Sequence, residues 1–97
     1  MSTAAGPGSA AAPTRPPLVL LYGREGCHLC EEALAGLVAL HAEGAVFELV
    51  EVDIESDDRL HRELLELIPV IEVDGVRASE LVPDLDAVRS RLATVEA

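Results

Sequence analysis

The segment Leu18–Tyr22 is an unbroken run of four aliphatic residues and a tyrosine, bounded by Pro17 and Gly23. A short apolar run between turn-forming residues is typical of a strand that is buried in the middle of a sheet. Apolar residues then recur at helical spacing over residues 27–43, and Gly44 follows as a C-terminal cap. A buried strand that leads through a short loop into a helix predicts the first unit of an α/β domain.

The helix over residues 27–43 is expected to bury one apolar stripe. That stripe consists of Leu29, Ala33, Leu37 and Leu40, widened by Leu34 and Val38. The next segment, Val46–Asp53, is rich in β-branched residues and is expected to be a strand. Because a strand–helix–strand crossover places its two strands side by side in the same direction, we expect these strands to be parallel.

The remainder of the chain carries signals for another helix, a hairpin and a last helix. Ser-Asp-Asp from Ser56 is a good helix start, and Pro69 stops that helix. Asp74-Gly75 suits a tight turn with positive φ, and Pro83 suits a first helical turn. The expected elements are a helix over Ser56–Leu67, strands at Val70–Val73 and Val76–Ala78, and a helix with Leu85, Val88 and Leu92 on one face. The predicted order is β-α-β-α-β-β-α, with a four-stranded mixed sheet flanked by helices.

Cys27 and Cys30 are the only cysteines, and they lie where the first strand pattern gives way to the first helix pattern. Two thiols separated by two residues can close a small disulfide ring. Free backbone N–H groups and the helix dipole stabilise a thiolate at a helix start. We therefore expect Cys27 to be the exposed, attacking thiol and Cys30, one turn along, to resolve the mixed disulfide.

Composition limits the classes of protein that remain. Ninety-seven residues, 49% of them hydrophobic, suggest one domain with a packed core, and one Tyr, one Phe and no Trp make that core aliphatic. Two cysteines are too few for a secreted disulfide scaffold. The net charge is −11, and all seven basic residues are arginines. This balance argues against nucleic acid and against anionic membrane surfaces as partners.

Residues 1–17 differ in composition from the rest of the chain, since they consist largely of Ala, Gly, Pro, Ser and Thr. We interpret them as a disordered N-terminal extension that precedes a domain at residues 18–97. The extension has neither an early basic cluster nor a sustained apolar stretch, so it does not resemble a signal peptide. The expected compartment is the cytoplasm, and the expected state is a monomer.

Three stretches resemble the glutaredoxins of the thioredoxin superfamily. Tyr22–Cys30 is similar to the stretch that runs from a strand-end tyrosine into a CxxC motif, Ile68-Pro69-Val70 looks like the cis-proline element, and Asp74-Gly75 matches the hairpin turn. The likeness covers most of residues 18–95 and is nearest to small bacterial glutaredoxin-like proteins. It implies a thioredoxin-like fold of the glutaredoxin type and the activity of a dithiol–disulfide oxidoreductase.

The resemblance also implies where a substrate binds. The Ile68–Pro69 peptide bond would be cis and would lie against the cysteines, and the backbone of Ile68 would pair with an extended substrate. Arg24, three residues before Cys27, would add positive charge beside the thiolate, and we place it with Ile68 and Pro69 among the substrate-binding residues. His28 is expected to be an exposed loop imidazole, and Tyr22 a packing residue.

Two departures from the family patterns concern the electron donor. Glutaredoxins hold glutathione with a Gly-Gly pair and an Asp after the hairpin, whereas this chain has Ser79–Pro83 there, including the anionic Glu80. Thioredoxins place a buried acid near the end of the first central strand, whereas this chain has Leu21. We expect poor use of glutathione. The expected donor is a flavoprotein of the thioredoxin-reductase type or another small thiol, and the expected substrate is a protein or low-molecular-weight disulfide.

Two other functions remain open at this point. One is a redox-inactive interaction module that keeps the fold. The other is minor metal binding by Cys27 and Cys30 with His28 or His41, although structural zinc usually takes four ligands and a second close pair is missing. We expect no cofactor and no resident metal.

Overall fold

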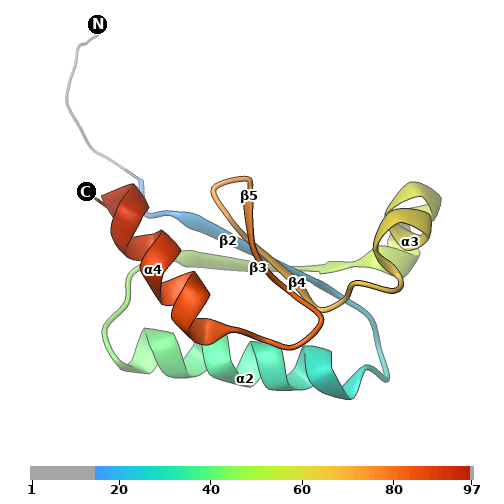
Figure 1. Ribbon diagram of the computed structural model, residues 1–97, viewed down its shortest axis with the longest axis horizontal. Helices are drawn as coiled ribbons and strands as arrows, with labels where there is room; N and C mark the ends of the chain where they lie inside the picture. The colour runs from blue at the N-terminus through green and yellow to red at the C-terminus, as the bar shows by residue number, and fades with distance from the viewer. Residues whose placement is uncertain (1–14, 97) are drawn as a thin grey trace, which may run out of the picture.

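The computed structural model describes residues 15–96 (Figure 1). The predicted disordered extension therefore lies almost entirely outside the described residues. The elements follow the predicted order with one added 3-10 turn. They are β2 (Leu18–Gly23), α2 (His28–Ala42), β3 (Glu48–Asp53), η1 (Ile54–Ser56), α3 (Asp58–Leu64), β4 (Val70–Val73), β5 (Val76–Glu80) and α4 (Leu85–Glu96).

The four strands form one sheet in the order β3-β2-β4-β5. β2 pairs in parallel with β3, from Leu18 opposite Glu48 to Gly23 opposite Asp53, and antiparallel with β4. β4 and β5 form the predicted hairpin, in which Asp74 and Gly75 both have positive φ, at 49° and 84°. The mixed sheet and the parallel pairing of the first two strands are confirmed.

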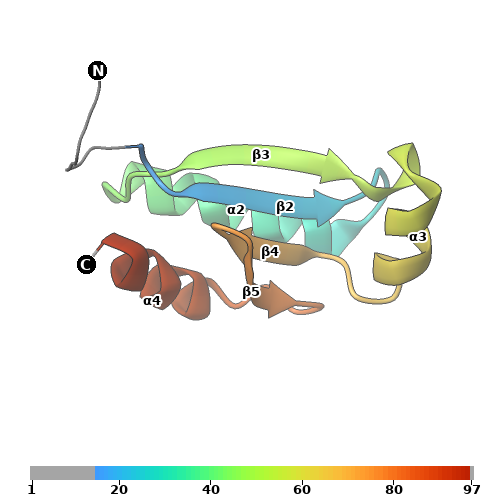
Figure 2. The same ribbon diagram turned by 90° about the horizontal axis from the view of Figure 1, so that it is seen from above.

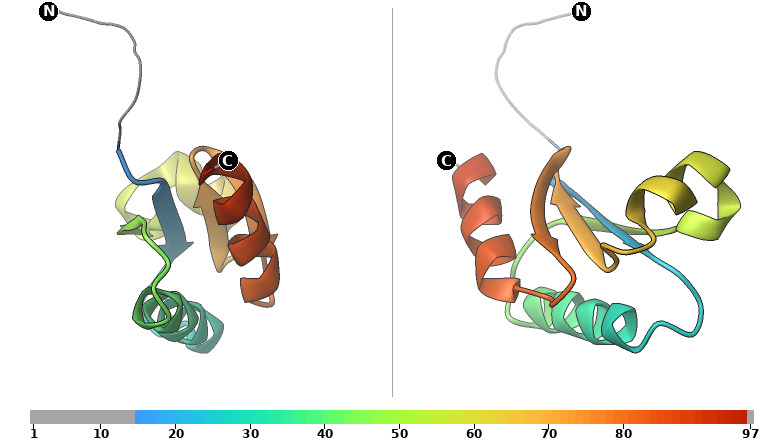
Figure 3. Two further views of the ribbon diagram at one scale, coloured as in Figure 1. Left: turned by 90° about the vertical axis from the view of Figure 1, so that its left-hand side faces the viewer. Right: turned by 45° about the vertical axis from the view of Figure 1, so that its right-hand side comes forward.

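Helices lie on both sides of the sheet, but not evenly (Figures 2 and 3). α2 and α4 lie together on one face, whereas α3 lies across the sheet from them at one end. Two clusters of buried side chains correspond to this arrangement. The larger cluster is Val19, Leu21, Ala33, Leu37, Leu40, Phe47, Ile71, Val73, Val88 and Leu92, and the smaller is Cys30, Ile54, Leu64, Ile68 and Val70. The core is aliphatic as expected, with Phe47 as its single aromatic ring.

The buried stripe of α2 differs from the predicted stripe at its first position. Cys30 is buried and takes the place expected for Leu29, which is 38% exposed. Val38 is also exposed. The reason is the helix start: Cys27 is the N-cap, so Cys30 lies in the first turn on the same face as Ala33.

The third and fourth predicted elements have different bounds from those expected. β3 begins at Glu48 rather than Val46, because Phe47 turns into the core as the chain enters the sheet. The helix expected over Ser56–Leu67 spans only Asp58–Leu64, because the N–H groups of Leu67 and Ile68 both turn back to the Leu64 carbonyl. The side chain of Asp57 accepts hydrogen bonds from the N–H groups of Arg59 and Leu60, which makes it the better cap. Within residues 15–96, no helix is both long enough and apolar enough to cross a membrane.

Candidate active site

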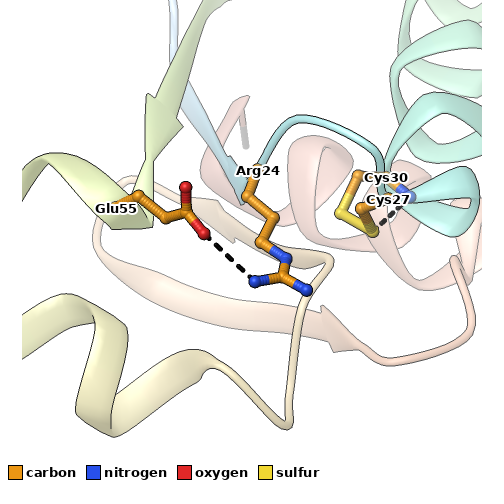
Figure 4. Close-up of a disulfide and its surroundings, with 4 residues drawn as sticks. All are labelled: Arg24, Cys27, Cys30 and Glu55. Atoms are coloured by element: carbon orange, nitrogen blue, oxygen red, sulfur yellow. Dashed lines mark hydrogen bonds and ion pairs between the residues drawn. A yellow bond between two sulfur atoms is a disulfide. The ribbon is translucent and has the colours of Figure 1, made fainter.

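The loop after β2 delivers both cysteines to the first turn of α2. Cys27 has extended backbone angles and acts as the N-cap, and its Sγ accepts a hydrogen bond from the N–H of Cys30 at 3.1 Å. The two residues are joined by a disulfide, with their Cα atoms 5.2 Å apart (Figure 4). The same N–H would face a Cys27 thiolate in the reduced protein. The helix start therefore offers the nucleophile a donor that is already in place.

The two sulfur-bearing residues differ in burial. Cys27 is half-buried, whereas Cys30 is 8% exposed and belongs to the smaller core cluster. The prediction that Cys27 is the more accessible residue is confirmed. Gly23 makes room for Cys30, since a Cβ atom on Gly23 would lie 3.0 Å from the Cys30 Sγ. Nothing in the sequence singled out Gly23 for this role, because the contact forms only when β2 and α2 pack together.

The Ile68–Pro69 peptide bond is cis, as the resemblance implied. Ile68 and Cys30 are members of the same buried cluster, and Cys27 packs against that cluster. The structure thus brings the predicted Ile68-Pro69 segment beside the cysteines. The N–H of Ile68 already donates to the Leu64 carbonyl at 3.0 Å, so an extended substrate would pair through the carbonyl of Ile68 or displace this bond.

Arg24 lies near the cysteines, but its guanidinium is directed elsewhere. It forms an ion pair with Glu55 at 3.1 Å, and Figure 4 shows the side chain reaching away from the disulfide toward the turn after β3. Its charge is therefore shared with a carboxylate. His28, the other basic group at the site, is exposed as expected and lies 2.9 Å from Glu32.

A cavity of about 300 Å³ adjoins Cys30. Its walls come from the end of β2, the loop before α2, the first turns of α2 and the end of β3. The charged residues that line it are Arg24, Glu25, Glu31, Glu51 and Asp53. Because four of these five residues are acidic, the cavity suits neutral or cationic groups better than anions.

Tyr22 lies on the sheet face opposite α2, where it packs against the smaller cluster. Its hydroxyl donates to Glu72 at 3.3 Å. Burial, then the charge of Glu72 and this hydrogen bond, raise the pKa of Tyr22, and the charge of Arg77 opposes them. This is the environment of a packing residue with one polar contact, as predicted.

His41 cannot share a metal ion with the cysteine pair. It lies in the last turn of α2, where its ring stacks on Phe47 and its Nε2 lies 2.7 Å from the Phe47 carbonyl oxygen. Eleven residues of helix place it about 16 Å from Cys30 along the axis. No group of three or more candidate ligands occurs in the described part of the chain.

The sheet order, the dithiol at the start of the first helix and the cis proline beside it define a thioredoxin-fold protein with a CxxC site. The chain belongs to the glutaredoxin-like domain family (DUF836), whose model matches residues 18–93.

Solved structures agree with this fold. Protein Ne2328 from Nitrosomonas europaea is 27% identical, with a TM-score of 0.66 over 84% of this chain and 98% of that one. Oxidised thioredoxin from Plasmodium falciparum is 14% identical, with a TM-score of 0.57 over 86% of this chain and 84% of that one. Thioredoxin f2 from Chlamydomonas reinhardtii is 16% identical, with a TM-score of 0.61 over 84% and 80% of the two chains. The curated proteins contain no match to this chain.

Proposed function

We propose that this protein is a dithiol–disulfide oxidoreductase. The Cys27 thiolate attacks one sulfur of a substrate disulfide, forming a mixed disulfide and releasing one substrate thiol. Cys30 then loses its proton and attacks the Cys27 sulfur, which releases the second substrate thiol. Two electrons pass to the substrate, and the protein is left with a Cys27–Cys30 disulfide. The single observation that carries this proposal is that disulfide, at a helix start and beside Ile68-Pro69.

The difference in burial supports the assignment of the two roles. Cys27 is accessible to a substrate, and its sulfur already accepts the Cys30 N–H. Cys30 is buried, so it meets the mixed disulfide from within the protein rather than an incoming substrate. A redox-inactive module would require neither the N-cap position of Cys27 nor this pairing.

The proposed electron donor is a flavoprotein reductase of the thioredoxin-reductase type or a small thiol other than glutathione. Arg24 and Arg77, the basic residues that could attract the carboxylates of glutathione, are paired with Glu55 and Glu80. Residues 18–97 hold six arginines against eighteen acidic residues, so the net charge of −12 repels an anionic tripeptide. We further propose that the protein acts as a monomer in the cytoplasm.

Turnover of a protein disulfide with each candidate donor tests this function. We expect reduction with a thioredoxin reductase and poor turnover with glutathione and its reductase. Cys27→Ser should abolish turnover, whereas Cys30→Ser should accumulate a mixed disulfide that mass spectrometry detects on Cys27. An inactive wild-type protein with every donor would refute the proposal, and unimpaired Cys27→Ser would refute the assigned roles.

A further inference from the structure

Leu81 has an unusual backbone conformation. Its φ is +65°, in the left-handed region, where a bulky side chain is strained and glycine or asparagine is favoured. Among residues 15–96, the only other non-glycine residue with positive φ is Asp74, which occupies the hairpin turn that suits it. The side chain of Leu81 is also not part of the hydrophobic core, because it is 46% exposed. Neither turn chemistry nor burial accounts for a leucine at this position.

Leu81 lies beside the loop that carries the cis proline. Its N–H donates to the Leu67 carbonyl at 2.9 Å, and Leu67 packs against the same buried cluster as Cys27. Figures 1 and 2 show the turn after β5 next to the loop before β4. The following residue, Val82, is 70% exposed. Leu81 and Val82 therefore expose apolar side chains next to the cis-proline loop, because Leu81 is hydrogen-bonded to the residue that precedes Ile68.

Hydrogen bonds hold this strained turn on its other side as well. Ser79 is 7% exposed, and its hydroxyl donates to the Val82 carbonyl at 3.4 Å and accepts the Asp84 N–H at 3.0 Å. Asp84 in turn caps α4 by accepting the N–H of Ala87 at 3.0 Å. The turn is thus fixed before any partner arrives, and strain that the surroundings maintain is a feature of functional sites.

The charges around the turn indicate which partner it suits. Three basic side chains near the site are paired with carboxylates, and the pairs are Arg24–Glu55, His28–Glu32 and Arg77–Glu80. An acidic partner would find no unpaired cation among these three. A partner with neutral or basic residues would be attracted by the excess of carboxylates.

We propose that Leu81, with Val82, is a specificity-determining contact for substrate disulfides. It selects substrates in which an apolar residue lies next to the cysteine and the other flanking residues are neutral or basic. This inference rests on the proposed oxidoreductase function and deepens it. The partner is a protein or peptide disulfide, and its apolar residue packs on Leu81 while its cysteine meets Cys27. The backbone strain at Leu81 is retained because asparagine or glycine there would remove this contact.

The test compares three peptide disulfides that differ only at the residues beside the cysteine: leucine with lysine, serine with lysine, and leucine with glutamate. We expect the wild-type protein to reduce the first about tenfold faster than the second, since one apolar contact discriminates by that order. It should also reduce the first faster than the third, since the acidic surface repels the glutamate. Leu81→Asn should abolish the preference for leucine while leaving the reduction of hydroxyethyl disulfide unchanged. Leu81→Met, which keeps an apolar side chain, should retain the preference.

Stability supplies a second readout. Leu81→Asn should raise the Tm, because asparagine tolerates positive φ, so stability and selectivity should move in opposite directions. Val46→Asn is the matched control, since Val46 is 62% exposed in the loop before β3, and it should leave selectivity unchanged. Equal rates with all three peptides, or a Leu81→Asn variant that keeps the preference, would overturn the inference while the oxidoreductase function stands. A protein that reduces no disulfide at all would instead overturn the function.

Discussion

Replacing Gly23 with alanine tests how closely β2 packs against the resolving cysteine. The new Cβ would lie 3.0 Å from the Cys30 Sγ and 3.1 Å from its Cβ, which is tighter than ordinary van der Waals contact. Gly23 does not have a positive φ, so the backbone accepts alanine without strain, and only the contact with Cys30 is perturbed. Cys30 is buried and has little room to retreat.

Overpacking of this kind destabilises a folded protein by about 1–3 kcal/mol. In a domain of this size each kcal/mol lowers the Tm by roughly 4–8 °C. We therefore expect the oxidised Gly23→Ala protein to unfold about 8–16 °C below the wild type, for a loss of about 2 kcal/mol. Thermal unfolding followed by circular dichroism measures this shift.

The background variant Cys30→Ala identifies the source of the effect. It removes the sulfur but keeps the Cβ atom that the new methyl group would meet, so Gly23→Ala should cost less in this background but not nothing. The difference between the two losses is the coupling energy of a double-mutant cycle. Gly23→Ala should also slow the resolution of a mixed disulfide, because it displaces the Cys30 sulfur. Identical Tm losses in the two backgrounds, or an unchanged Tm in the first, would refute the proposed packing.

Tyr22 is the only tyrosine, so an absorbance titration reports it directly, and we expect a midpoint above 10.0 that falls in Glu72→Gln. Because folding raises the pKa of Tyr22, the contribution of this residue to stability is complete below its unfolded-state pKa and is lost as the pH rises through its folded-state pKa. The Tm should therefore fall more steeply above pH 10 in the wild type than in Tyr22→Phe. Gly36→Ala should lose about 1 kcal/mol despite better helix propensity, because its Cβ would lie 2.8 Å from Leu85 of α4. In the Leu85→Ala background, Gly36→Ala should cause no further loss of stability. Losses of stability that simply add in the double variant would count against this contact.

Local patterns in the sequence were sufficient to predict much of the fold. The apolar run of β2 needed only its own composition and its bounding residues, and the Asp74-Gly75 turn needed only its two residues. The position of Cys27 at the start of α2 followed from where the helical spacing began. These features depend on neighbours in the chain, which is why they could be read without a structure.

Several features that depend on contacts between distant segments carried no signal in the sequence. The pairing of Arg24 with Glu55 forms only when the turn after β3 reaches the loop before α2. The positive φ of Leu81 carries no sequence signal, because leucine is among the residues least suited to it. The start of α3 differs from the prediction because Ser56, Asp57 and Asp58 are all good caps, and Ser56 is taken up by the 3-10 turn η1.

The most direct test of the central claim is to follow the two cysteines through one exchange reaction. The reduced protein would be mixed with an excess of a peptide disulfide, quenched with acid at intervals and analysed by mass spectrometry after proteolysis. We expect an adduct that appears first on Cys27 and is then replaced by the Cys27–Cys30 disulfide, with release of both peptide thiols. An adduct that forms first on Cys30, or two thiols that stay reduced throughout, would contradict the account.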